Sequence, residues 1–234
     1  MAGNQRQKSR CGLIFPKNRV YLCQEKQELP GFMLLKTRYM ILRKIPYQES
    51  SLVVSGISPD FGRLDFLLKG ARSSGGKKFP YAGLFRELQV EFRENPSGSG
   101  LLYMKTHEPL ADFDAIASYP ENYLLLCDWV QFLLKHTRPM LELHNTYSAL
   151  LTALSRLTQP GGGEFQLAAA KLVFLQESGF VPDPPQDDPQ RAAALEKLLT
   201  YAIDPEQCEP AFSPEYRTRL TEWIRSLCRY AESF

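Results

Sequence analysis

The sequence predicts an α+β protein with an N-terminal five-stranded OB-fold β-barrel followed by an all-α helical domain. Apolar residues recur at every second position between Lys36 and about His107, which is typical of short strands. Beyond Pro109 the apolar period changes to 3.6, which is typical of amphipathic helices. Five short strands in roughly 70 residues suit a small closed barrel. We therefore expect a polar extension over residues 1–35, an OB-fold domain over 36–108 and a helical domain over 109–234.

The expected strands are each bounded by turn residues. They cover Thr37–Ile45, Ser51–Ile57, Arg63–Lys69, a fourth segment with Leu88, Val90 and Phe92 on its inner side, and Leu101–Thr106. The third alternates most clearly, because Leu64, Phe66 and Leu68 point one way and the charged residues Arg63, Asp65 and Lys69 point the other. A glycine-rich basic loop, residues 70–78, follows it, and we interpret the loop as flexible.

Five helices are expected after the barrel. Their apolar stripes or bounds are residues 123–134, residues 143–157, Phe165–Ser178, Arg191–Ile203 and Glu215–Tyr230. The third is apolar nearly all round, which predicts a central, buried helix that ends at Gly179. Ser213 and Pro214 are suited to begin the last helix as its N-cap and first residue.

The charge is divided unevenly along the chain. Residues 1–110 hold 18 Lys and Arg against 9 Asp and Glu, whereas residues 111–234 hold 10 against 17, so the two parts carry +9 and −7. This division predicts a basic surface for a polyanion on the barrel and another task for the acidic helical part. The alternative is that the two parts neutralise each other across an interface.

The sequence offers no catalytic or metal-binding pattern. Its five cysteines are scattered without a C-x-x-C pair, and the three histidines lie in unrelated contexts. Gly161–Gly163 lacks the Lys-Ser/Thr of a phosphate-binding loop. We therefore predict no enzyme activity, no cofactor and no metal. The apolar run Leu13–Phe15 is too short for a signal peptide, and no run approaches membrane-spanning length, so we expect a cytoplasmic protein without membrane contact.

Single-stranded DNA is the expected ligand of the basic barrel, since a positive groove beside a barrel face follows a phosphate backbone. The candidate DNA-binding residues are Arg38, Arg43, Lys44, Arg63, Lys69, Arg72, Lys77 and Lys78. The alternative for each is an ordinary solvated surface cation. Candidate aromatic residues for base stacking are Tyr39, Tyr47, Phe61, Phe79, Tyr81 and Tyr103, although core or turn packing would explain most of them.

Several segments resemble the RecO family of bacterial recombination mediators. Arg38–Ser51 is similar to the opening strand of that family and its Tyr-Gly-Glu-Ser type turn. Ser58–Gly62 and Lys69-Gly70-Ala71-Arg72 are similar to a turn and a "K-G-A-R" segment of the same family. Phe165–Pro182 resembles its buried helix ending in "G-x-x-P". The resemblance covers about residues 36–185 in the family's order.

The resemblance implies a cytoplasmic, nucleoid-associated DNA repair protein of the RecF pathway that binds and anneals single strands. It also implies that the protein engages RecR and the tail of single-strand-binding protein, and indirectly helps to load RecA. The sequence departs from the family in three ways: it has no four-cysteine zinc module after residue 182, it carries a long N-terminal extension, and Gln48 stands where glycine is usual.

The helical domain is the expected site for protein partners, because its negative charge would repel DNA. The cations available there for an acidic tail are Arg138, Arg156, Lys171, Arg217, Arg219, Arg225 and Arg229. Two other functions compete with DNA binding: a non-catalytic scaffold whose barrel binds an acidic protein, and an RNA-binding OB protein, since no residue pattern here distinguishes the 2′-hydroxyl.

Overall fold

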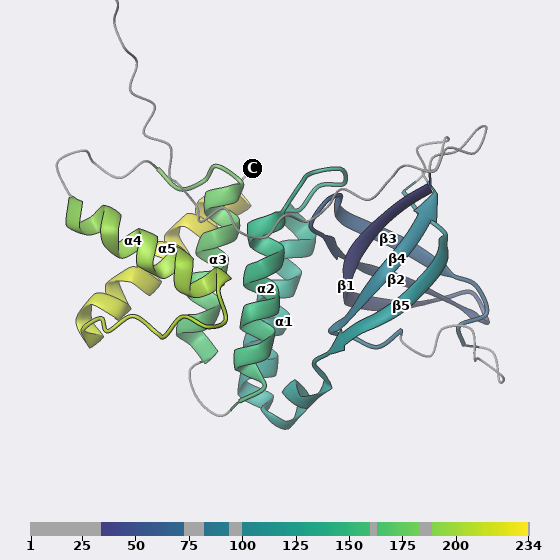
Figure 1. The fold of residues 1–234 in the computed structure, drawn as a ribbon, viewed down its shortest axis with the longest axis horizontal. Coiled ribbons are helices and arrows are strands. Elements are labelled where there is room, and N and C mark those ends of the chain that lie inside the picture. Colours follow the sequence, from purple (N-terminus) through teal and green to yellow (C-terminus); the bar gives the residue numbers. More distant parts are fainter. Residues whose placement is uncertain (1–33, 73–81, 94–99, 160–162, 183–188, 234) are drawn as a thin grey trace, which may run out of the picture.

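The computed structural model describes residues 34–72, 82–93, 100–159, 163–182 and 189–233, and within them five strands precede five α-helices (Figure 1). The strands are β1 (Leu34–Tyr47), β2 (Ser51–Ser58), β3 (Gly62–Leu68), β4 (Arg86–Arg93) and β5 (Met104–Asp112). A short 3₁₀ turn, Asp114–Ser118, leads to the helices. These are α1 (Pro120–His136), α2 (His144–Leu157), α3 (Gly163–Glu177), α4 (Pro189–Ile203) and α5 (Pro214–Glu232).

The strands form one curled antiparallel sheet in the order β3-β2-β1-β4-β5. Its two edges meet at a parallel bridge between Phe66 and Leu102. There the Leu67 amide donates to the Leu102 carbonyl at 2.9 Å, and the Leu102 amide donates to the Asp65 carbonyl at 2.8 Å. This order and closure are those of a five-stranded OB barrel, so the predicted fold class is confirmed.

Alternation along the strands builds the barrel core. Leu64, Phe66 and Leu68 of β3 and Leu88, Val90 and Phe92 of β4 point inward as predicted. Together with Tyr39, Ile41 and Val54 they form the barrel core. Tyr39 is fully buried, and its hydroxyl donates to the carbonyls of Val54 at 3.2 Å and Leu64 at 3.1 Å. Burial raises the pKa of this phenol well above its usual value.

The fifth strand differs from the prediction. Leu101–Thr106 was expected, but β5 begins at Met104 and continues to Asp112. The first helix, α1, begins at Pro120 and contains the predicted apolar stripe over residues 123–134. Proline is tolerated because β5 pairs through this segment with β4 alone, where Leu88 lies opposite Pro109. An edge strand accommodates a residue that lacks an amide donor.

The helices pack around α3, which is buried over most of its length as predicted. Glu177, at its end, accepts hydrogen bonds from the amides of Asn145 and Thr146 at 3.0 and 2.8 Å. These two amides belong to the first turn of α2, whose own N-cap side chain makes no capping bond. Gly179 has φ +77° directly after α3, as expected for a left-handed helix end. Ser213 caps α5 through the Tyr216 amide.

The loop between α1 and α2 joins the helices to the barrel. The Arg63 amide donates to the Arg138 carbonyl at 3.3 Å, and the amides of Met140 and Leu143 donate to the turn between β2 and β3 at 2.8 Å each. Gly62 makes this approach feasible, because it has φ +61° and a β-carbon there would lie closer than 3.0 Å to the carbonyl oxygens of Arg138 and Leu141. The barrel and helices therefore share a fixed joint.

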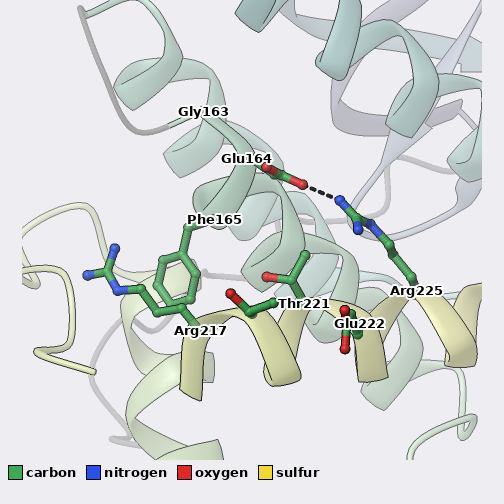
Figure 2. A pocket seen from close by; sticks show the side chains of 8 residues that line it. Gly163, Glu164, Phe165, Arg217, Thr221, Glu222 and Arg225 are labelled. Carbon is green, nitrogen blue, oxygen red and sulfur yellow. Dashed lines mark hydrogen bonds and ion pairs between the residues drawn. The ribbon is translucent and has the colours of Figure 1, made fainter. Parts of the chain in front are cut away.

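An open cavity of about 530 Å³ lies between the start of α3 and α5 (Figure 2). Phe165 lies beside it, with the Arg217 guanidinium 4.8 Å from the centre of its ring. Arg217 also pairs with Glu209, and Arg225 pairs with Glu164 across the cavity. The cavity thus combines one aromatic ring with two arginines already held by carboxylates.

Candidate nucleic-acid interface

The outer face of β1, β2 and β3 consists of rows of residues that lie opposite one another. Directly paired residues of an antiparallel sheet point to the same side. The row Val54–Phe66 belongs to the barrel core, so the alternating rows face outward. Along β1 these outward rows are Met40–Ile57–Arg63, Arg43–Ser55–Asp65, Ile45–Val53–Leu67 and Tyr47–Ser51, with Lys69 one residue beyond β3.

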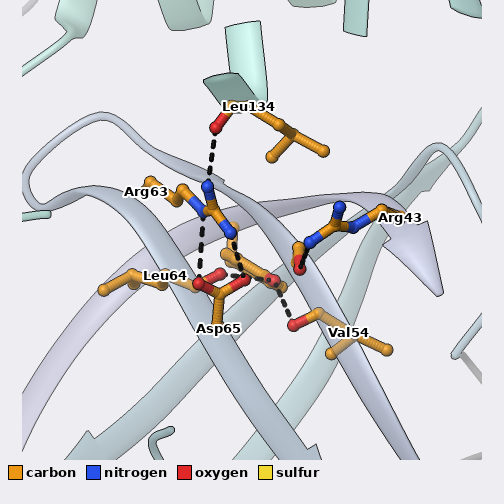
Figure 3. Close-up of polar contacts among 8 residues, drawn as sticks. Arg43, Val54, Arg63, Leu64, Asp65 and Leu134 are labelled. Carbon is orange, nitrogen blue, oxygen red and sulfur yellow. Dashed lines mark hydrogen bonds and ion pairs between the residues drawn. The ribbon is translucent and has the colours of Figure 1, made fainter. Parts of the chain in front are cut away.

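Helices cover only the first of these rows. Met40 and Ile57 belong to the same buried cluster as the helical core. The Arg63 guanidinium donates to the Leu134 carbonyl near the end of α1 at 2.7 Å and to both oxygens of Asp65, at 3.1 and 3.4 Å (Figure 3). The remaining rows have exposed members, with Ile45 44% and Tyr47 40% exposed. We call the rows from Arg43 to Tyr47, together with Lys69, the distal face.

The predicted DNA-binding cations divide into three groups. Arg43 and Lys69 lie on the distal face, and Arg72 lies at the adjoining turn, where its guanidinium donates to the Gln48 carbonyl at 3.4 Å. Lys44 is exposed, but its pairing with Val54 directs it to the opposite side of β1. Lys77 and Lys78 lie outside the described residues.

Arg38 and Arg63 are at the joint instead. The Arg38 guanidinium is 3.6 Å from the Glu87 carboxylate and 5.1 Å from the centre of the Tyr147 ring on α2. The Tyr147 hydroxyl donates to Glu87 at 3.0 Å, and the pKa of this phenol is raised chiefly by burial and then by the Glu87 charge. These contacts could not be predicted from the sequence, because Arg38, Glu87 and Tyr147 lie far apart in the chain.

The turn between β1 and β2 borders the distal face. Gln48 has φ +53°, a left-handed conformation in which a non-glycine residue is uncommon. The Arg72 amide donates to the Ser50 carbonyl at 2.8 Å, so the segment after β3 holds this turn in place. In OB barrels the β2–β3 face, this turn and the β4–β5 loop are where oligonucleotides bind.

The candidate aromatics are also separated by the structure. Tyr39 is in the core, Phe61 is partly buried against it, and Tyr47 and Tyr103 are exposed. Phe79 and Tyr81 lie outside the described residues. The outward apolar residues Ile45, Val53 and Leu67 were not recognised in the sequence as part of a candidate site. Strand pairing was the missing information, since only the register places them in one row.

Comparison with known proteins matches the family model "Recombination protein O N terminal" to residues 33–113, which contain the complete barrel. Residues 33–113 are thus similar to the N-terminal domain of the RecO family. The chain is 28% identical over 153 residues to the DNA repair protein RecO of Aliivibrio fischeri strain MJ11, a match that covers 62% of this chain and 59% of that protein. It is 25% identical over 144 residues to the protein of the same name from Alteromonas mediterranea, covering 61% and 59%. The matched region thus spans about three fifths of these RecO proteins.

Neither a metal centre nor a membrane span is found in the described ranges. Among these residues, no group of three or more His, Cys, Asp or Glu side chains could hold a metal ion. No helix in them is both long and apolar enough to cross a bilayer. The candidate site is the distal face, where Arg43 and Lys69 lie beside outward apolar side chains.

Proposed function

We propose that this chain is a non-catalytic recombination mediator in DNA repair that binds single-stranded DNA on the distal face of its barrel. The observation that carries the proposal is the position of Arg43, Lys69 and Arg72 on and beside the face that OB barrels use for oligonucleotides. The net charge of +9 over residues 1–110 adds attraction for phosphates. Annealing of strands, cytoplasmic and nucleoid location, and cooperation with RecR in loading RecA rest on the family resemblance.

The test is a salt series of binding titrations with single-stranded DNA, single-stranded RNA and duplex DNA. Changing Arg43, Lys69 and Arg72 together to Ala should weaken binding to all single-stranded sequences and reduce the log–log salt slope by roughly 2, at about 0.7 per phosphate contact. The matched control changes three exposed cations of the helical domain, Lys197, Arg219 and Arg229, and should leave the slope unchanged. Absence of any nucleic-acid binding would favour the scaffold alternative, and preference for RNA would favour the RNA-binding alternative.

The basic loop after β3 is part of the same proposal. Arg72 holds one end of it beside the distal face, and Lys77 and Lys78 follow in the sequence. Changing these three residues to Ala should also lower the salt slope by roughly 2. A slope identical to that of the wild type would remove the loop from the interface.

We also propose that the cavity between α3 and α5 receives the acidic, Phe-ended tail of single-strand-binding protein. Arg217 and Arg225 supply cations there, and Phe165 offers an aromatic contact for the terminal ring. A carboxylate of the tail would replace Glu209 as the ion-pair partner of Arg217, or Glu164 as the partner of Arg225. Arg156 is a poorer candidate, because its guanidinium donates to Gln166 and to the carbonyls of Tyr201, Asp204 and Gln207.

Titration of the full chain with the tail peptide tests this assignment. Binding should weaken when the terminal Phe is deleted and when Arg217 and Arg225 are changed to Ala. The control variant Arg219→Ala should bind the peptide normally, because Arg219 does not line the cavity. Equal binding by the double variant and the wild type would place the tail elsewhere.

A further inference from the structure

Tyr103 projects from a fixed point of the barrel rim into solvent. Its neighbours Leu102 and Met104 pack against the barrel core, whereas the Tyr103 side chain is 54% exposed and belongs to neither buried cluster. The backbone of Leu102 is held from both sides by hydrogen bonds to Asp65 and Leu67 of β3. Among the described residues, neither buried cluster accounts for an aromatic ring on such a rigid support.

The ring lies beside Lys69, one of the cations of the distal face. The Lys69 ammonium is 4.9 Å from the centre of the Tyr103 ring. Lys69 directly follows β3 and continues the outward alternation of Asp65 and Leu67. Tyr103 itself ends the connection between β4 and β5, one of the two loops that frame the binding face of OB barrels. An aromatic surface and a positive charge thus adjoin at the corner of the proposed interface.

We propose that Tyr103 is a base-stacking residue, on which one base of a bound single strand lies flat while Lys69 pairs with the neighbouring phosphate. This inference rests on the proposed function and specifies how the face holds a base. Stacking on an exposed ring is tolerant of sequence, because every base has a π-face. A cation that already lies over the ring needs only a small movement to reach a phosphate attached to the stacked nucleotide.

Tyr103 and Lys69 would contribute to the binding free energy in different ways, one by stacking and the other by electrostatic attraction. Loss of a stacking ring weakens binding by a factor that hardly depends on salt, since no counterion is released by stacking. Loss of Lys69 removes one phosphate contact and should reduce the log–log salt slope by roughly 0.7. The salt dependence therefore separates the stacking residue from an electrostatic one.

The experiment titrates oligothymidylate, and the same oligomer made of abasic sugar-phosphate, with the wild type and with Tyr103→Leu, Tyr103→Phe and Lys69→Ala variants. Leu keeps an apolar side chain without a π-face, so Tyr103→Leu should bind oligothymidylate roughly 5- to 150-fold more weakly with an unchanged salt slope. Tyr103→Phe should bind within about twofold of the wild type. On the abasic oligomer, Tyr103→Leu and the wild type should bind equally. Tyr230→Leu, which changes a tyrosine of similar exposure on α5, is the matched control and should have no effect.

The outcomes separate this inference from the proposed function. Equal binding of oligothymidylate by Tyr103→Leu and the wild type would overturn the stacking role while leaving DNA binding intact. A loss that is as large on the abasic oligomer, or that is shared by Tyr103→Phe, would also overturn it, because the effect would then not come from a ring and a base. If the wild type binds neither oligomer, the proposed function itself fails.

Discussion

Replacement of Gly62 by alanine should break the joint between barrel and helices. Gly62 has φ +61°, and alanine in the left-handed region costs about 1 kcal/mol. An added β-carbon would also lie closer than 3.0 Å to the backbone oxygens of Arg138 and Leu141. Backbone cannot rotate away as a side chain can, so the loop between α1 and α2 must move.

The size of the effect follows from the bonds that this movement would break. The loop is attached by the amides of Arg63, Met140 and Leu143, at 3.3, 2.8 and 2.8 Å from their acceptors. At about 1 kcal/mol each, their loss together with the conformational strain amounts to about 4 kcal/mol. Alanine also lowers the conformational entropy of the unfolded chain, which offsets about 0.7 kcal/mol of this loss in stability. We therefore expect the free energy of unfolding to fall by about 3 kcal/mol.

Three further glycine-to-alanine variants separate the strain of a positive φ from the clash of the added β-carbon. Gly179 has φ +77° with no atom within 4 Å of a β-carbon, so its variant should lose only about 0.5–1 kcal/mol. Gly56 has the opposite combination, since no positive φ is required but a β-carbon would clash with the Met40 carbonyl, so a loss of about 2 kcal/mol or more is expected. Gly100 has neither feature and should change stability by less than about 0.5 kcal/mol.

The assay is urea denaturation followed by tryptophan fluorescence, for which the fully buried Trp129 on α1 is an internal probe. The reasoning would be refuted if Gly62→Ala lost no more stability than Gly179→Ala. Such a result would mean that the loop adjusts without losing its bonds to the turn.

Three other predictions concern the joint, acid stability and metal content. Tyr147→Phe removes the donor to the buried Glu87 carboxylate and should cost about 2 kcal/mol in urea unfolding, whereas Tyr201→Phe, whose hydroxyl is 3.5 Å from Glu209, should cost less than about 0.5 kcal/mol. Burial lowers the pKa of His107 and of His136, so below the ordinary value of about 6.5 the unfolded chain binds protons that the folded chain does not. The free energy of unfolding should therefore fall as the pH is lowered from about 7 to 5. A His107→Gln/His136→Gln variant should show a smaller fall in its urea midpoint over the same range. Elemental analysis of the purified full chain should find no stoichiometric zinc; metal whose chelation unfolds the protein would contradict this.

Period and turn chemistry predicted the fold because each strand carries its own signal. The alternation of Leu64, Phe66 and Leu68 identifies β3 without reference to any partner. β5 lacked such a signal, because an exposed edge strand containing Pro109 buries few side chains and leaves no clear alternation. Its position follows from pairing with β4, which is a property of the folded sheet.

The candidate site was predicted in composition more than in arrangement. A surplus of cations on the barrel half can be counted in the sequence, and it indicated Arg38 and Arg63 as readily as Arg43 and Lys69. Only the folded chain brings Leu134 to Arg63 and Glu87 to Arg38, contacts between residues far apart in sequence. A guanidinium held by a carboxylate, as in Arg38 and Arg63, is a weaker candidate for phosphate than the exposed Arg43, whose guanidinium donates to the Ser55 hydroxyl at 3.3 Å.

The arrangement of the two halves is also compatible with an acidic domain next to the proposed DNA-binding barrel. The helices contact the outer face at the row of Met40, and Tyr47 lies at the far end of the same strand. At about 3.3 Å per residue, this end is roughly 20 Å from the covered row. Electrostatic screening in 0.15 M salt acts over about 8 Å, so the net charge of −7 on residues 111–234 has little effect at the far end. The cations beside Tyr47 can therefore attract phosphates despite the negative charge of the helical part, which is consistent with the proposal that a single strand binds to the distal face and protein partners to the helices.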